Sequence, residues 1–142
     1  MTDKLIDTNI IVYAYDTSEK EKHSISKDIL KQIWKYGGGI VCLQNVMEFF
    51  VIITKKVKNP IDIIEAKTII EDFLKSENWK VIDRDEDTFL KAIDIVSKYN
   101  IHLWDAVIVA CMKENDINEI VTENKKDFGK IPDIKVIVPF EN

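Results

Sequence analysis

The segment Lys4–Asp16, KLIDTNIIVYAYD, places an acid between two apolar runs. Residues 4–7 predict a short buried strand, and residues 9–15 predict a helix. Asp7 therefore lies at a strand end between Ile6 and Ile10, where an isolated carboxylate is costly to bury. Either Asp7 caps the following helix, as aspartate commonly does, or another group compensates its charge.

Beyond this segment, short apolar runs alternate with segments of helical periodicity. This alternation predicts an α/β fold, a three-layer α/β/α sandwich whose central sheet is mainly parallel and has about five strands. Ligands of such sheets bind beyond the carboxyl ends of the strands, so we expect Asp7 to face a crevice. The further predicted strands are 39–43, 80–83, 119–121 and 135–139, and the further predicted helices are 21–36, 45–57, 61–74, 86–98 and 104–113.

The composition predicts one domain, residues 1–142, because the chain of 142 residues has no repeat and no Pro/Gly-rich linker. Gly37–Gly39 fit a helix stop followed by a turn. Cys42 and Cys111 lie in apolar runs and fit buried thiols of a reducing compartment. No signal segment or membrane-spanning run is evident, so we expect a cytoplasmic protein without membrane contact. The net charge of −5 differs from the basic footprint typical of nucleic-acid-binding proteins.

Four acids stand out by position: Asp7, Glu48, Asp105 and Asp127. Each has an ordinary explanation: a helix cap for Asp7 and Asp105, a solvated helix stripe for Glu48, a polar turn for Asp127. Asp7 lies at the end of the first predicted strand, and Glu48 lies on the helix after the second. Asp105 lies in the first turn of a buried helix, and Asp127 follows the fourth strand. Neighbouring carboxylates raise one another's pKa, and Mg²⁺ or Mn²⁺ bound to their oxygens would relieve this repulsion.

Four segments, in this order and spacing, resemble the motifs of PIN domains, which are metal-dependent ribonucleases: LIDTNIIVYAYD, QNVMEFF, HLWDAVIVA and VTENKKDF. The chain most resembles the toxins of VapBC-type toxin–antitoxin pairs, and the resemblance covers nearly its whole length. It implies a PIN-like sandwich with the first three family acids at Asp7, Glu48 and Asp105. Many relatives have an aspartate at the position of Asn124, whereas Asp127 matches a variant pattern in which an asparagine comes first.

The resemblance implies hydrolysis of RNA phosphodiester bonds by a metal-activated water, with one or two Mg²⁺ or Mn²⁺ ions. It implies that Asp7, Asp105 and Asp127 bind metal, and that Glu48 binds metal directly or orients its water. Asn124 either completes the site or binds a water or phosphate oxygen. The residues that resemble supporting positions of the family are Thr8, Asn9, Thr122 and Asn124.

The net charge does not exclude RNA. Discounting the four predicted site acids changes the net charge from −5 to −1, so local lysine clusters become more important. Lys55 and Lys56 follow Glu48 on its predicted helix, and Lys125 and Lys126 precede Asp127. These four lysines are candidate RNA phosphate contacts, although a solvated surface explains them equally well.

Several aromatic and histidine side chains allow two interpretations. Tyr13, Tyr15 and Trp104 have rings that can stack on bases, but aromatic residues beside apolar runs more often pack in a core or an interface. His102 fits a loop or capping position better than a role in the site.

The resemblance also implies two protein partners. A small VapB-like antitoxin would occupy the acidic crevice with an arginine or lysine, and the protein would form a homodimer. The segment 45–74 has more apolar positions than one core-facing stripe needs, so it is the candidate interaction surface. The apolar residues of this surface are Phe49, Phe50, Ile52, Ile63, Ile64 and Ile70.

Three other functions remain open from the sequence. A haloacid dehalogenase-like phosphatase also begins with a strand-end aspartate, but it needs a second acid where this chain has Asn9. A phosphoacceptor signalling domain would use an aspartate such as Asp83 at a strand end. A non-catalytic PIN-like binding module is the third alternative.

Overall fold

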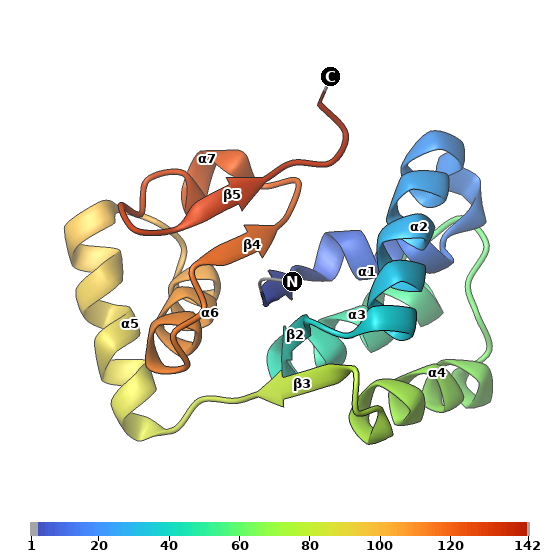
Figure 1. Ribbon diagram of the computed structural model, residues 1–142, viewed down its shortest axis with the longest axis horizontal. Coiled ribbons are helices and arrows are strands. Elements are labelled where there is room, and N and C mark those ends of the chain that lie inside the picture. The colour runs from blue at the N-terminus through green and yellow to red at the C-terminus, as the bar shows by residue number, and fades with distance from the viewer. Residues whose placement is uncertain (1–2, 142) are drawn as a thin grey trace.

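The computed structural model describes residues 3–141, and its centre is a five-stranded sheet in the order β3-β2-β1-β4-β5. Every pair of neighbouring strands is parallel. The predicted α/β class and the prediction of about five mainly parallel strands are therefore confirmed (Figure 1). The strands are β1 (Lys4–Ile6), β2 (Gly39–Cys42), β3 (Trp79–Ile82), β4 (Glu119–Val121) and β5 (Lys135–Ile137).

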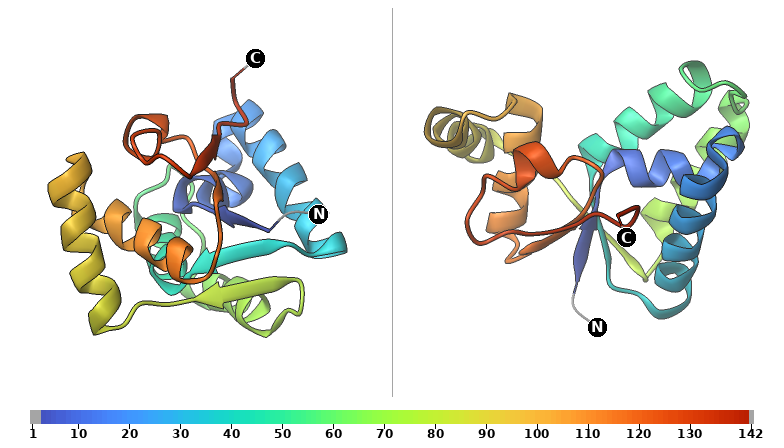
Figure 2. Two further views of the ribbon diagram at one scale, coloured as in Figure 1. Left: turned by 60° about the vertical axis from the view of Figure 1, so that its left-hand side comes forward. Right: turned by 90° about the horizontal axis from the view of Figure 1, so that it is seen from above.

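Helices cover both faces of the sheet, which gives the predicted three layers (Figures 1 and 2). On one face lie α1 (Thr8–Tyr15), α2 (Lys20–Tyr36), α3 (Leu43–Lys55) and α4 (Ile63–Lys75), with the short 3-10 turn η1 (Thr17–Glu19) between α1 and α2. On the other face lie α5 (Glu86–Tyr99), α6 (Leu103–Glu114) and α7 (Lys125–Phe128).

Successive strand residues point to opposite faces and divide the core into two clusters. Leu5, with Ile40 and Ile120 on the neighbouring strands, packs in the cluster that contains α5 and α6. The next residue, Ile6, packs with Val41 and Val121 in the cluster that contains α1 to α4. The apolar runs of the sequence are therefore buried on both sides, as a parallel sheet requires.

Phe73 on α4 should contribute strongly to stability. Its ring is 1% exposed, and its centroid lies 5.0 Å from that of Trp34 and 4.8 Å from that of Trp79. We expect Phe73→Ala to lower the free energy of unfolding by about 3–5 kcal/mol in urea titrations. Phe89→Ala is the control, because Phe89 is 47% exposed, and a similar loss in both variants would contradict this expectation.

Some predicted boundaries are wrong by a few residues. The helix predicted at 45–57 begins at Leu43, and the helix predicted at 61–74 begins at Ile63. Asp62 caps the latter by accepting a hydrogen bond from the Ile64 amide, so Pro60 lies in the preceding loop. The last strand ends at Ile137, and the segment predicted as a loop after β4 contains α7.

The predicted interaction surface on 45–74 is wrong for Phe49, whose side chain is fully buried in the core. Ile63 and Ile64 are exposed, at 57% and 74%. Phe50, Ile52 and Ile70 are partly buried against the core. Of the six residues predicted for this surface, only Ile63 and Ile64 at the start of α4 are therefore exposed, while other exposed apolar side chains of the segment are Met47 and Val51 on α3 and Leu74 on α4.

Two further features match the sequence. Cys42 and Cys111 are buried, as predicted, and Gly37 and Gly38 adopt positive φ angles of 84° and 88° at the end of α2, as a helix stop requires. Among residues 3–141, no helix has the length and apolar character needed to cross a membrane.

Candidate metal centre

The predicted crevice lies where the direction of the strand order changes. β1 is followed in sequence by β2 and β3 on one side, whereas β4 and β5 lie on its other side. Such a change separates the loops at the carboxyl ends of the two adjacent strands. Asp7 follows β1 and Thr122 follows β4, and the Asp7 amide donates a hydrogen bond of 3.0 Å to the Val121 carbonyl.

The Asp7 carboxylate is 7% exposed and accepts hydrogen bonds on both oxygens. Oδ1 accepts from the Thr8 amide at 2.8 Å and from the Asn45 side chain at 3.2 Å. Oδ2 accepts from the Thr122 hydroxyl at 2.7 Å and from the Asn9 side chain at 3.4 Å. Asp7 is thus the N-cap of α1. It is also one of four neighbouring acids, Asp7, Glu48, Asp105 and Asp127, which we call the acidic cluster. A capping role and a place in a charged site are therefore compatible for Asp7.

Sequence reasoning missed Asn45, which is fully buried beneath Asp7. Its amide group donates to Asp7 Oδ1 and, at 2.9 Å, to the Thr8 hydroxyl, while its oxygen accepts from the Cys42 amide at 3.0 Å. The last contact caps the start of α3. Cys42 and Asn45 do not match the usual Ser/Thr and Glu/Gln pair of a capping box, so the sequence carries no clear signal for this position.

Asp105 and Asp127 approach Asp7 from α6 and α7. The Asp127 side chain lies close enough to Asp105 to raise the pKa of Asp105. Asn124 donates a hydrogen bond of 3.1 Å to Asp105 Oδ2, and its own oxygen accepts from the Asp127 amide at 3.3 Å, which caps α7. Asn124 therefore contacts the Asp105 carboxylate and the backbone of Asp127.

The acids raise one another's pKa, as expected for clustered carboxylates. The pKa of Asp105 is raised from 3.8 to about 7. Burial is the largest cause, and the interaction with the Asp127 side chain is the second. The charges of Asp7, Asp127 and Glu48 act in the same direction. Burial also raises the pKa of Asp7, although the hydrogen bonds from Thr122, Thr8 and Asn45 oppose it.

Glu48 lies at the edge of this cluster, on α3. Its Oε1 accepts a hydrogen bond of 2.9 Å from Gln44, whose amide also lies 3.4 Å from the Trp104 carbonyl. Glu48 lines a groove of about 490 Å³ together with Lys56, Arg84 and the exposed Trp104. Of the predicted phosphate contacts, Lys56 therefore lines the same groove as Glu48.

The donor set suits a hard cation, because it consists of carboxylate and amide oxygens. Within residues 3–141 no lysine or arginine pairs with Asp7, Glu48, Asp105 or Asp127. No three side chains of His, Cys, Asp or Glu in that range already form a set able to hold an ion. Cation binding therefore requires some of these carboxylates to move closer together.

The remaining predicted phosphate contacts and the ring side chains near Asp105 are mostly at the surface. Lys55 and Lys126 are exposed, and Lys125 pairs with Glu141 at 3.6 Å. His102 occupies the N-cap position of α6, but its side chain makes no capping hydrogen bond. Trp104 is 62% exposed, so it is not a core residue.

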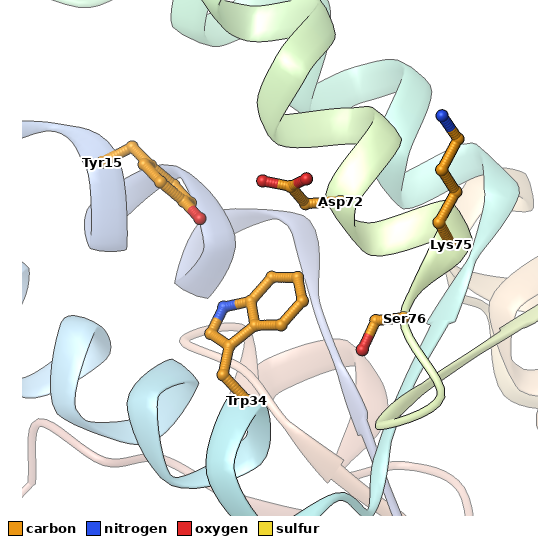
Figure 3. Close-up of a pocket in the computed structure, with 5 residues that line it drawn as sticks. All are labelled: Tyr15, Trp34, Asp72, Lys75 and Ser76. Atoms are coloured by element: carbon orange, nitrogen blue, oxygen red, sulfur yellow. The ribbon is translucent and has the colours of Figure 1, made fainter.

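A second hollow, of about 500 Å³, lies between α1, α2 and α4, where Figure 3 shows Tyr15, Trp34 and Asp72 around it. The pKa of Tyr15 is raised to about 12, chiefly by burial and to a smaller extent by the negative charge of Asp72. The ring centroid of Tyr15 also lies 5.5 Å from that of Phe49. None of the four acids lines this hollow, so Tyr15 serves packing away from the cluster.

The parallel sheet and the carboxylates at its strand ends define an α/β protein with an acidic centre. Residues 4–134 match the model of the PIN domain family. The chain therefore belongs to the PIN domain family. No curated protein matches the sequence.

Solved structures share this fold at low sequence identity. A toxin–antitoxin complex from Klebsiella pneumoniae matches with a TM-score of 0.70 and 22% identity, over 99% of this chain and 100% of that chain. VapBC2 from Rickettsia felis, bound to a DNA fragment from its promoter, matches with a TM-score of 0.66 and 18% identity, over 95% and 97%. VapC20 from Mycobacterium tuberculosis, a toxin that cleaves the sarcin–ricin loop, matches with a TM-score of 0.65 and 12% identity, over 83% and 87%.

Proposed function

We propose that this protein is a divalent-metal-dependent endoribonuclease and the toxin of a type II toxin–antitoxin pair. The observation that carries the proposal is that Asp105 lies near three other carboxylates: burial raises the pKa of Asp105 to about 7, and the charges of Asp7, Asp127 and Glu48 act in the same direction. Membership of the PIN domain family and the similar folds of VapC-type toxins support it. This assignment gives no support to the phosphatase alternative, and Asp83, the candidate phosphoacceptor, is exposed and paired with Arg84.

In this proposal Asp7, Asp105 and Asp127 hold Mg²⁺ or Mn²⁺, which supplies an activated water and offsets charge that develops on the phosphate. Thr122, Thr8 and Asn45 fix the Asp7 carboxylate through the hydrogen bonds described above. Asn124 orients Asp105, and Asn9 links Asp7 to the segment after β4.

The groove beside Glu48 is the proposed approach for RNA. Lys56 and Arg84 provide positive charge along its wall, and Glu48 lies at the end that meets the acids. Electrostatic contacts of this kind position a phosphate backbone without reading its sequence. We propose that Lys125 and Lys126 contact phosphates on the α7 side.

The proposal extends to partners and organisation. We propose that residues 1–142 form a single domain, that the protein forms a homodimer, and that it acts in the cytoplasm. A VapB-like antitoxin would inhibit it by placing an arginine or lysine against Asp7 and Asp105, because a cation there replaces the metal charge. Sedimentation of the protein with and without a co-expressed antitoxin tests both assemblies.

Metal dependence is the direct test. Purified protein should cleave single-stranded RNA in the presence of Mg²⁺ or Mn²⁺, and excess EDTA should abolish cleavage until metal is restored. Calorimetric titration with Mn²⁺ should detect binding without RNA. Cleavage that continues in EDTA at the same rate would contradict the metal mechanism, and absence of cleavage despite Mn²⁺ binding would favour a non-catalytic module.

A further inference from the structure

A polar cluster of Tyr13, Lys22 and Glu123 joins three elements beside the metal centre. The Tyr13 hydroxyl on α1 donates a hydrogen bond of 2.6 Å to Glu123 Oε1. The Lys22 ammonium on α2 donates to Glu123 Oε2 and lies 5.2 Å from the centroid of the Tyr13 ring. One carboxylate therefore connects α1 and α2 to the segment that follows β4.

Glu123 lies between two residues that contact the acids. Thr122 donates to Asp7 Oδ2 at 2.7 Å, and Asn124 donates to Asp105 Oδ2 at 3.1 Å. The Glu123 amide also donates to the Asn9 side chain at 3.2 Å. Residues 122–124 therefore link Asp7 to Asp105 through hydrogen bonds, and Asp127 follows this segment on α7.

The segment after β5 covers the cluster. The ring of Phe140 packs edge-on against Tyr13, with centroids 5.4 Å apart and an interplanar angle of 85°. Lys22 lies 5.5 Å from the Phe140 centroid, and Glu141 pairs with Lys125 at the start of α7. The Lys22 ammonium therefore lies near both aromatic rings, while the Lys22 and Glu123 side chains are 40% and 36% exposed.

Electrostatics favour an ionised Glu123. Burial raises the pKa of Glu123, but the hydrogen bonds from Lys22 and Tyr13 outweigh burial and lower the pKa overall. The pKa of Lys22 is raised, chiefly by the same hydrogen bond. The cluster therefore keeps both charges at neutral pH.

We propose that Glu123, held by Tyr13 and Lys22, is a positioning residue that sets the affinity of the acidic cluster for a divalent cation. The inference rests on the proposed function, since it assumes that Asp7, Asp105 and Asp127 bind metal. Glu123 itself acts through Thr122 and Asn124. A half-exposed ion pair contributes little to global stability, so its effect should be local.

The test measures Mn²⁺ affinity by calorimetry without RNA. Glu123→Ala should raise the dissociation constant about 10-fold, as expected when a group that orients metal ligands is removed. Glu123→Gln should partly restore affinity, because its amide oxygen can still accept from Tyr13. Tyr13→Phe should weaken binding in the wild-type background but have little further effect beside Glu123→Ala, because the two side chains act through one contact.

Glu114, at the end of α6 away from Asp105, is a matched control for Glu123. Glu114 accepts a hydrogen bond of 2.6 Å from the Thr88 hydroxyl and one of 2.7 Å from the Lys91 ammonium, which reproduces the hydroxyl and lysine pair on Glu123. Glu114 lies nine residues beyond Asp105, or about 13 Å along the helix. Glu114→Ala should leave Mn²⁺ affinity unchanged.

Amide hydrogen exchange without metal provides an independent readout. Glu123→Ala should accelerate exchange at residues 123–127 and leave β1 unchanged, because only the segment after β4 loses its anchor. Unaltered exchange in this segment, unaltered Mn²⁺ affinity, or an equal loss of affinity in Glu114→Ala would each overturn the inference. If the wild-type protein bound no Mn²⁺, the proposed function would fail, whereas the exchange result would still decide whether Glu123 positions the segment.

Discussion

Asp7→Asn should reduce metal-dependent RNA cleavage at least 100-fold. The substitution keeps the size of the side chain but removes a negative charge from the centre of the cluster. If the metal contributes about 3 kcal/mol or more to stabilising the developing charge, its loss lowers the rate of cleavage at least about 100-fold. Single-turnover cleavage at saturating Mn²⁺ measures the effect.

The fold should survive this substitution, although at some cost in stability. Asp7 accepts from donors on both oxygens, and asparagine offers only one acceptor. Asp16→Asn is a matched control, since Asp16 is also buried and caps η1 through Ser18, outside the cluster. Asp16→Asn should retain cleavage, and more than a tenth of wild-type activity in Asp7→Asn would disprove the central role of Asp7.

Asp105→Asn should make the metal-free protein more stable at neutral pH. The folded-state pKa of Asp105 is raised from 3.8 to about 7, so ionisation costs free energy in the folded state. Asparagine removes this cost and can still accept a hydrogen bond from Asn124. We expect a gain of about 1–2 kcal/mol at pH 8, because water partly screens the half-buried carboxyl.

The pH dependence follows from the sign of the shift. Between pH 4 and pH 7 Asp105 binds more protons in the folded wild-type protein than in the unfolded chain, so the contribution of Asp105 to stability falls as the pH rises through this window. The advantage of Asp105→Asn should therefore be absent below pH 4, grow through the window and level off above pH 7. Urea titrations in EDTA at several pH values measure it.

Asp85 supplies a control with the opposite sign. Hydrogen bonds from Thr88 lower the pKa of Asp85, the N-cap of α5, so its ionised form stabilises the fold and this stabilisation is lost as the pH falls. Asp85→Asn should destabilise the protein at pH 8. A stabilisation by Asp85→Asn, or a loss of stability in Asp105→Asn at pH 8, would contradict the electrostatic explanation.

The sequence was sufficient to predict the layers and the order of the elements, because buried parallel strands are continuous apolar runs. It also predicted that Asp7, Asp105 and Asp127 follow strands or begin helices that meet at one edge. Helix starts were less predictable. The helix predicted to begin at residue 45 begins at Leu43, because the Asn45 side chain caps it by accepting a hydrogen bond from the Cys42 amide.

Side-chain interactions between distant segments were beyond the sequence. The contact between Asn45 and Asp7 spans 38 positions, and that between Tyr13 and Glu123 spans 110. Neither pair follows a periodic pattern, since only the packing of strands and helices brings the partners together. Phe49 was misplaced for the same reason, because the apolar residues of α3 do not reveal which side faces the sheet.

The strand order affects how this protein is made on the ribosome. β1 is synthesised first, but β4, which lies directly beside it, is among the last elements to emerge. A nascent chain that ends before residue 119 carries Asp7, Glu48 and Asp105, yet it lacks Thr122, Asn124 and Asp127. The proposed nuclease centre therefore closes only near the end of translation, so under the proposed function an unfinished chain would be unable to cut the message that encodes it.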